Sequence, residues 1–121
     1  MDRALPECLL GSLFNKRPEI EIENIKFHKI FYGMKNDPEH KELLKDIRFS
    51  GSLVNPYSEM LEEALFNLQF SGCLSRKNPD LVSYSTTEHF DISYQNLIRE
   101  LPKDILGKLD KFSTDLLNKL S

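Results

Sequence analysis

The sequence has few of the features that mark a secreted, metal-stapled or membrane-bound protein. It contains 2 cysteines, Cys8 and Cys73, no tryptophan and 5 scattered glycines. This cysteine pattern resembles neither a disulfide framework nor a zinc site. The apolar runs are too short to span a membrane, and the N-terminus lacks the basic and apolar regions of a signal peptide. We therefore expect a cytoplasmic protein with reduced thiols and no membrane segment.

An excess of charge of one sign is also missing. The chain has 16 basic and 19 acidic residues, which leaves a formal net charge of −3. Such a mixture creates no strong general attraction for nucleic acid or anionic lipid. With 40% hydrophobic residues among 121, the composition fits one hydrophobic core. We expect a single domain over residues 1–121, with residues 87–120 as a C-terminal helical extension.

Sequence motifs of enzymes and cofactor sites are absent. The chain has no G-x-S-x-G, no phosphate-binding glycine loop and no H-E-x-x-H. His28, His40 and His89 do not have the spacing of metal ligands, so structural or surface roles are expected for them. We predict no catalytic residue, no metal, no cofactor and no enzymatic activity.

Apolar residues recur at helical spacing and predict five or six helices. The stripes lie within residues 3–15, 27–36, 37–47, 55–72, 86–98 and 105–120. Asn55 and Pro56 predict the N-cap and first residue of the fourth helix, and Gly72 predicts its C-terminal cap. Polar residues 15–24, 35–42 and 75–80 are predicted to be connections.

A β-hairpin is predicted directly after the fourth helix. Residues 73–76 and 81–85 are short extended runs, and residues 77–80 between them have turn chemistry. Residues 49–54 can hold one more short strand. A helix, a tight end and a hairpin in this order predict a mainly α (α+β), winged helix-turn-helix-like fold with a small antiparallel wing.

Two short stretches carry a family resemblance. They are Lys-Ile-Phe-Tyr at residues 29–32 and Asn-Pro-Tyr-Ser at residues 55–58, which leads into an apolar stripe ending at Gly72. Over residues 24–90 the chain resembles the Panacea-type winged-helix family of small bacterial and phage antitoxins and proteolysis adaptors. It departs from that pattern at Asn55, where the family has glycine. The resemblance implies a non-catalytic role in binding protein or DNA.

The fourth predicted helix favours a protein partner. Residues 55–72 include Glu59, Glu62 and Glu63 and no lysine or arginine, whereas a helix that lies against DNA phosphates normally carries basic residues. Phe66 and Phe70 lie away from the main apolar stripe. They are either core residues of a helix buried from two sides, which we favour slightly, or an exposed partner surface. These five residues are the candidate protein interface of an antitoxin-like, adaptor-like or inhibitory regulator.

The alternative function is a DNA-binding transcriptional regulator. Lys26, Lys29, Arg76 and Lys77 are its candidate phosphate contacts, although a solvated helix face and a polar turn are the commoner explanation of such residues. The last helix carries an apolar stripe that usually packs on its own domain but that can also form a dimer seam. That possible homodimer would use Ile105, Leu109, Phe112 and Leu116.

Overall fold

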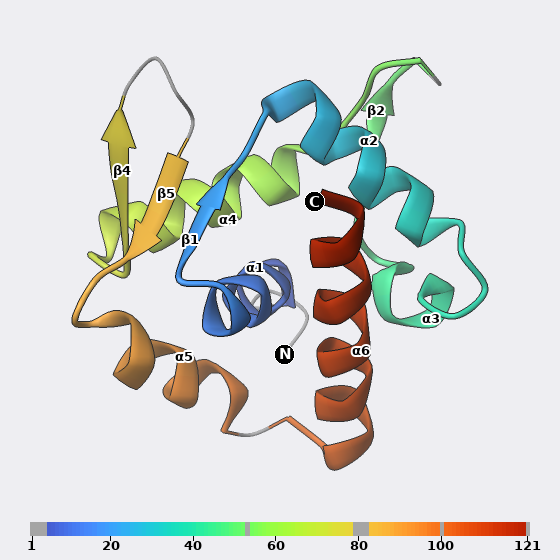
Figure 1. The fold of residues 1–121 in the computed structure, drawn as a ribbon. Helices are drawn as coiled ribbons and strands as arrows, with labels where there is room; N and C mark the ends of the chain where they lie inside the picture. Colours follow the sequence, from blue (N-terminus) through green and yellow to red (C-terminus); the bar gives the residue numbers. More distant parts are fainter. Residues whose placement is uncertain (1–4, 53, 79–82, 100, 121) are drawn as a thin grey trace.

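The computed structural model describes residues 5–52, 54–78, 83–99 and 101–120, and this part of the chain contains six helices and small antiparallel sheets (Figure 1). The helices are α1 (Leu5–Lys16), α2 (Asn24–Lys35), α3 (Lys41–Leu44), α4 (Glu59–Phe70), α5 (Phe90–Ile98) and α6 (Lys103–Leu120). The strands are β1 (Glu19–Glu21), β2 (Ser50–Gly51), β3 (Pro56–Tyr57), β4 (Leu74–Asn78) and β5 (Ser83–Thr86). The prediction of a mainly helical α+β fold is confirmed. No helix in these ranges is long and apolar enough to cross a membrane.

Helix α1 lies at the centre of the core. Its side chains Leu9, Leu10 and Leu13 are fully buried, and α4, α5 and α6 all pack against it. A helix surrounded in this way must be apolar on most of its faces, which explains why the hydrophobic stripe of residues 5–14 is so wide. Gly11 is buried on the side of α1 that faces Tyr94 of α5.

A three-stranded antiparallel sheet has the order β1-β5-β4. Tyr84 in the central strand lies opposite Ile20 on one side and Arg76 on the other. Strand β1 was not predicted, because residues 15–24 were assigned to a connection. The alternation Glu-Ile-Glu-Ile-Glu at residues 19–23 is the signal for it, since a period of two places both isoleucines on the buried face.

The second sheet pairs β2 with β3, the strand that directly precedes α4 in the chain. Gly51 has φ +84°, and a Cβ atom there would lie 2.6 Å from the Asn55 carbonyl oxygen. Glycine is therefore required for both the backbone conformation and the close approach. The short strand expected within residues 49–54 is present as β2, whereas residue 53 lies outside the described residues.

Several predicted boundaries were wrong. The helix predicted at residues 37–47 is shortened to α3. Turns flank it on both sides: the His40 backbone N–H donates to the Asp37 carbonyl oxygen before it, and the Ile47 N–H donates to the Leu44 carbonyl oxygen after it. Helix α5 starts at Phe90, since Thr87 takes part in the turn before it. Strand β4 extends to Asn78, past the expected end at Arg76. Residues 79–82 of the predicted turn and second strand lie outside the described residues.

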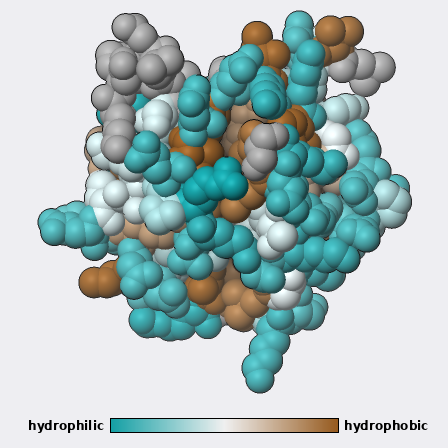
Figure 2. All heavy atoms as spheres, in the orientation of Figure 1, coloured by the Kyte–Doolittle hydropathy of each residue, from teal (hydrophilic) through white to brown (hydrophobic). Residues whose placement is uncertain are grey.

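The apolar stripe of α6 packs inside its own chain. Leu109, Phe112 and Leu116 are at most 2% exposed, Ile105 is half-buried against the same core, and α6 contacts α1 and α2. Leu109, Phe112 and Leu116 have little surface to offer a second copy, so α6 would have to leave the core for these residues to form the expected dimer seam with Ile105. Figure 2 shows mostly hydrophilic side chains on the face that carries β1 and α6, with apolar atoms in separate patches.

Candidate protein-docking face

Helix α4 begins at Glu59, and its N-cap is Ser58, three residues after the predicted cap Asn55. The Ser58 hydroxyl accepts a hydrogen bond from the Leu61 backbone N–H at 3.4 Å, as an N-cap does. Pro56 and Tyr57 cannot belong to the helix, because they form β3 and pair with β2. At the other end, Gly72 has φ +83° and follows the helix as predicted, in the left-handed conformation that glycine adopts readily.

A buried histidine holds the start of α4 against α2. The backbone N–H of Ser58 donates to Nδ1 of His28 at 3.1 Å, and His28 is 1% exposed. Because Nδ1 accepts this bond, the proton of a neutral ring lies on Nε2, which faces Oε2 of Glu62 at 3.7 Å. Tyr57 stacks on the same ring with 4.8 Å between centroids. His28 is therefore structural, as expected, and it orients the first turns of α4.

The outward side of α4 carries all five residues of the predicted protein interface. Glu59 and Glu63 are exposed, Glu62 is partly exposed, and Phe66 and Phe70 are 60% and 82% exposed. The slightly favoured expectation that the two phenylalanines belong to the core was wrong. Their rings stack on each other, with 5.9 Å between centroids. We call these five residues the α4 face.

A groove runs beside the α4 face, between α1, α4 and α5. Most of its exposed lining atoms are carbon, and its residues include Glu7, Asn67, Leu68, Cys73, Asn96 and Leu97. The Asn67 side-chain amide donates to Oε1 of Glu7 at 3.0 Å. Oε2 of Glu7 is buried and has no hydrogen-bond partner among the described residues. We call this hollow the Glu7 groove; sequence reasoning missed it because α1 and α4 are far apart in the chain.

The four candidate phosphate contacts do not lie on one element. Lys26 and Lys29 are exposed on α2, whereas Arg76 and Lys77 belong to β4. In Figure 1, α2 and β4 lie on different sides of β1. The Arg76 guanidinium lies over the Tyr84 ring, 6.0 Å from its centroid. The structure therefore provides two separate basic segments.

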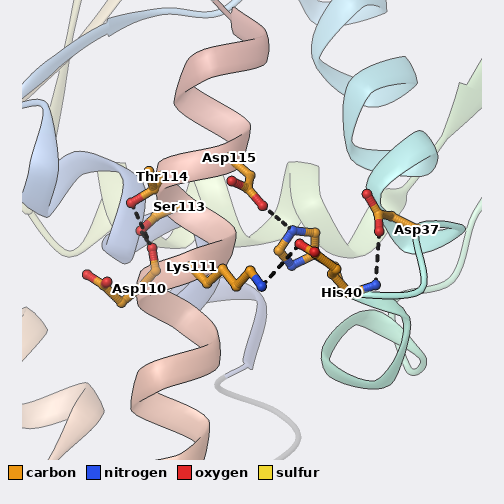
Figure 3. Close-up of polar contacts among 8 residues, drawn as sticks. Asp37, His40, Asp110, Lys111, Ser113, Thr114 and Asp115 are labelled. Carbon is orange, nitrogen blue, oxygen red and sulfur yellow. Dashed lines mark hydrogen bonds and ion pairs between the residues drawn. The ribbon is translucent and has the colours of Figure 1, made fainter.

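One group of potential metal ligands lies where the turn before α3 meets α6 (Figure 3). Glu39, His40 and Asp115 place one nitrogen and two carboxylate oxygens within 4.8 Å of one another. His40 is 2% exposed, and its Nε2 is 2.7 Å from Oδ2 of Asp115, while Glu39 is 3.2 Å from Nζ of Lys111. Each group already has a protein partner, so the cluster acts as a cross-link between α6 and the turn before α3.

Burial raises the pKa of two ionisable side chains in the core, Cys8 and Tyr94. Burial, and secondarily the charge of Glu7, raises the pKa of the Cys8 thiol to about 11. Burial also raises the pKa of Tyr94 to about 12, with smaller contributions from Cys8 and Asp110. A thiol that stays protonated at neutral pH is a poor nucleophile. The exposed side chain of His89 lies 3.6 Å from the carboxylate of the adjacent Glu88.

None of three comparisons, with protein-family models, with curated proteins and with solved structures, finds a match for this chain.

Proposed function

We propose that this chain is a non-catalytic protein-docking module of winged-helix type, antitoxin-like or adaptor-like in its mode of action, and that the α4 face binds its partner. The order of elements from α1 to β5 supports the winged-helix assignment. A first helix, a strand, further helices and a hairpin follow one another, and the first strand pairs with the last strand of the hairpin. In this scheme α4 occupies the position of the recognition helix, and β4 and β5 form the wing.

The observation that carries the proposal is the exposure of a stacked phenylalanine pair on an acidic helix face. Two exposed aromatic rings leave roughly 300 Å² of apolar surface in water, a patch large enough to mark a binding site. Aromatic side chains at the centre of an interface commonly become its hot spots. The surrounding glutamates repel DNA phosphates, and they provide the polar rim that a protein partner meets.

Affinity capture with two single variants and a matched control tests this function. Phe66→Asp and Phe70→Asp place a charge in the patch, and each is expected to weaken a stoichiometric partner complex at least ~30-fold, because hot-spot substitutions cost about 2 kcal/mol or more. Ile92→Asp is the control, since Ile92 is 71% exposed on α5 and belongs neither to the α4 face nor to the lining of the Glu7 groove. The proposal fails if both phenylalanine variants are folded and bind as the wild type does.

The alternative of a DNA-binding regulator predicts a different behaviour. The exposure of Lys26 and Lys29 supports it, and Arg76 on the proposed wing adds a third cation. Binding to random duplex DNA through these residues would weaken steeply with salt, because each phosphate contact releases counterions. A fluorescence-polarisation titration at two salt concentrations separates the alternatives. Salt-sensitive DNA binding that Lys26→Ala and Lys29→Ala reduce would favour the regulator over the docking module.

A further inference from the structure

We propose that the α4 face binds one amphipathic helix of the partner, antiparallel to α4, in which an apolar pair of residues precedes a basic pair. This inference rests on the proposed function and names the chemistry of the partner. The apolar pair packs on Phe66 and Phe70, and the two lysine or arginine side chains lie opposite Glu59 and Glu63.

The outermost residues of α4 form a straight seam. Four exposed residues occupy positions i, i+4, i+7 and i+11: Glu59, Glu63, Phe66 and Phe70. An α-helix turns by about 100° per residue, so these positions lie within roughly 60° of one another around the helix axis. The buried residues of α4 lie on the opposite side: Leu61, Ala64, Leu65 and Leu68. The seam therefore points away from the core, with the alternating spacing of four and three that one helix uses to pack along another.

The seam has two chemically different halves. Its N-terminal half is the acidic pair Glu59 and Glu63, and its C-terminal half is the stacked pair Phe66 and Phe70. The whole seam is about 16 Å long, so a partner helix of about three turns covers both halves. Such a helix needs apolar side chains at one end of its contact surface and a complementary charge at the other.

The acidic half is not neutralised within the described part of the chain. Neither Glu59 nor Glu63 forms an ion pair there, and α4 itself has no lysine or arginine. Arg48 lines a hollow beside Glu63 without reaching ion-pair distance. Two neighbouring carboxylates without a cation attract a basic partner and repel an acidic one, so lysine or arginine is the complementary residue.

The helix dipole determines the orientation of the partner helix. Glu59 lies in the first turn of α4, where a negative charge interacts favourably with the positive end of the dipole. In an antiparallel partner, the residue opposite Glu59 lies towards the C-terminal end of its own helix, where lysine and arginine are favourable for the same reason. A parallel partner would place its basic pair towards its N-terminal end, where positive charge is unfavourable. The antiparallel order therefore suits both helices.

A second copy of α4 does not have the complementary pattern. Two copies packed antiparallel would place Glu59 opposite Phe70 and Glu63 opposite Phe66, which desolvates carboxylates against aromatic rings. Two copies packed in parallel would place each glutamate opposite its own equivalent, and like charges repel. The occupant is therefore a helix other than α4, which under the proposed function belongs to the partner protein.

Selection from a helix library on the full chain tests the inference. The library presents a stable helical scaffold with randomised residues at surface positions i, i+4, i+7 and i+11. We expect enriched helices with apolar residues at the first two positions and lysine or arginine at the last two. The double variant Glu59→Lys with Glu63→Lys is expected to bind these helices at least ~10-fold more weakly. In its own selection it should enrich aspartate or glutamate at the last two positions.

Two further variants serve as controls. Glu21→Lys with Asp104→Lys changes the net charge by the same amount at exposed positions outside α4, and Asp104 lies in the first turn of α6 as Glu59 does in α4. This variant should bind the selected helices as the wild type does. Phe66→Asp is expected to bind them at least ~10-fold more weakly, because the apolar half contributes as well as the charged half.

Several outcomes would overturn the inference. These are no enrichment, no basic preference at the last two positions, basic residues before the apolar pair, or the same preference in the charge-reversed variant. Helices that bind Phe66→Asp as tightly as the wild type are held by general charge attraction and would also refute it. Selected helices with glutamate in place of their basic pair are compared on the wild-type chain, where they should bind at least ~10-fold more weakly. That comparison stands even if the charge-reversed variant does not fold.

Failure of the inference can be told apart from failure of the proposed function. Helices that depend on Phe66 and Phe70 but not on Glu59 and Glu63 would refute the basic pair and leave the docking face intact. Failure of the docking face itself shows separately, in the affinity capture with Phe66→Asp and Phe70→Asp.

Discussion

Gly11 packs closely against Tyr94 in the core, and its replacement by alanine is expected to destabilise the protein. A Cβ atom there would lie 2.7 Å from Cδ1 and 3.0 Å from Cε1 of the Tyr94 ring. That ring is 6% exposed and stacks on Phe90, so it has little room to move. Overpacking of this kind costs about 1–3 kcal/mol, and the better helix propensity of alanine offsets about 1 kcal/mol. We therefore expect a net loss of up to about 2 kcal/mol.

Two other helical glycines provide internal controls. A Cβ atom at Gly33 in α2 or Gly107 in α6 would meet no atom of the described residues within 4 Å, so alanine there should stabilise the protein by about 0.5–1 kcal/mol. At about 4 °C per kcal/mol, Gly11→Ala should lower the melting temperature by up to about 8 °C and the other two should raise it by about 2–4 °C. Thermal unfolding followed by circular dichroism measures all three. The reasoning is refuted if Gly11→Ala melts at or above the wild-type temperature, or if Gly11→Ala remains destabilising when Tyr94 is replaced by leucine.

Three further predictions concern the cap of α4, the cross-link to α6 and the alkaline limit of stability. Ser58→Ala should cost about 1 kcal/mol in urea unfolding, because it removes the hydroxyl that caps α4; an unchanged midpoint would contradict this role. His40→Ala and Asp115→Ala should each cost about 1–3 kcal/mol, and the double variant should cost less than the sum; additive losses would show that the two groups are not coupled. The pKa values of Cys8 and Tyr94, about 11 and about 12, lie above their ordinary values of 9.0 and 10.0, so the unfolded state loses these protons first and stability should fall as the pH rises above about 9. Tyr94→Phe should make this loss of stability with pH shallower. Urea midpoints of the wild type and of Tyr94→Phe are measured at about pH 8 and about pH 10.5. An equal drop in the two proteins would refute the role of Tyr94 in the alkaline loss of stability.

The sequence predicts most of the helical framework because its signals are local. The apolar stripe of residues 61–68 and Gly72 predict α4 and its end, and the stripe of α6 predicts its burial. The start of α4 was misplaced at Asn55 because a cap residue followed by proline is a common helix start. Here Pro56 instead pairs with Gly51, a contact that sequence spacing alone does not reveal.

The candidate site was predicted only in part, for a physical reason. Helical periodicity places Phe66 and Phe70 opposite the main stripe, but it cannot say whether a second element covers that side. The structure shows that they are exposed. The Glu7–Asn67 contact joins residues 60 positions apart, and neither residue belongs to a motif. A carboxylate in the first turn of a helix is explained by its favourable interaction with the helix dipole, so Glu7 does not indicate a groove in the sequence.

Helix α4 is anchored at both ends, which suits a surface that binds without rearrangement. At its start, His28 accepts the hydrogen bond of the Ser58 N–H, and at its end the Thr87 hydroxyl donates to the Gly72 carbonyl oxygen. A helix held in this way presents its side chains in fixed directions, so a partner orders few additional groups when it binds. Phe66 and Phe70 also restrict each other's side-chain rotation, because their rings stack. The rigidity of α4 therefore favours docking on a preformed face over a mechanism in which α4 itself rearranges.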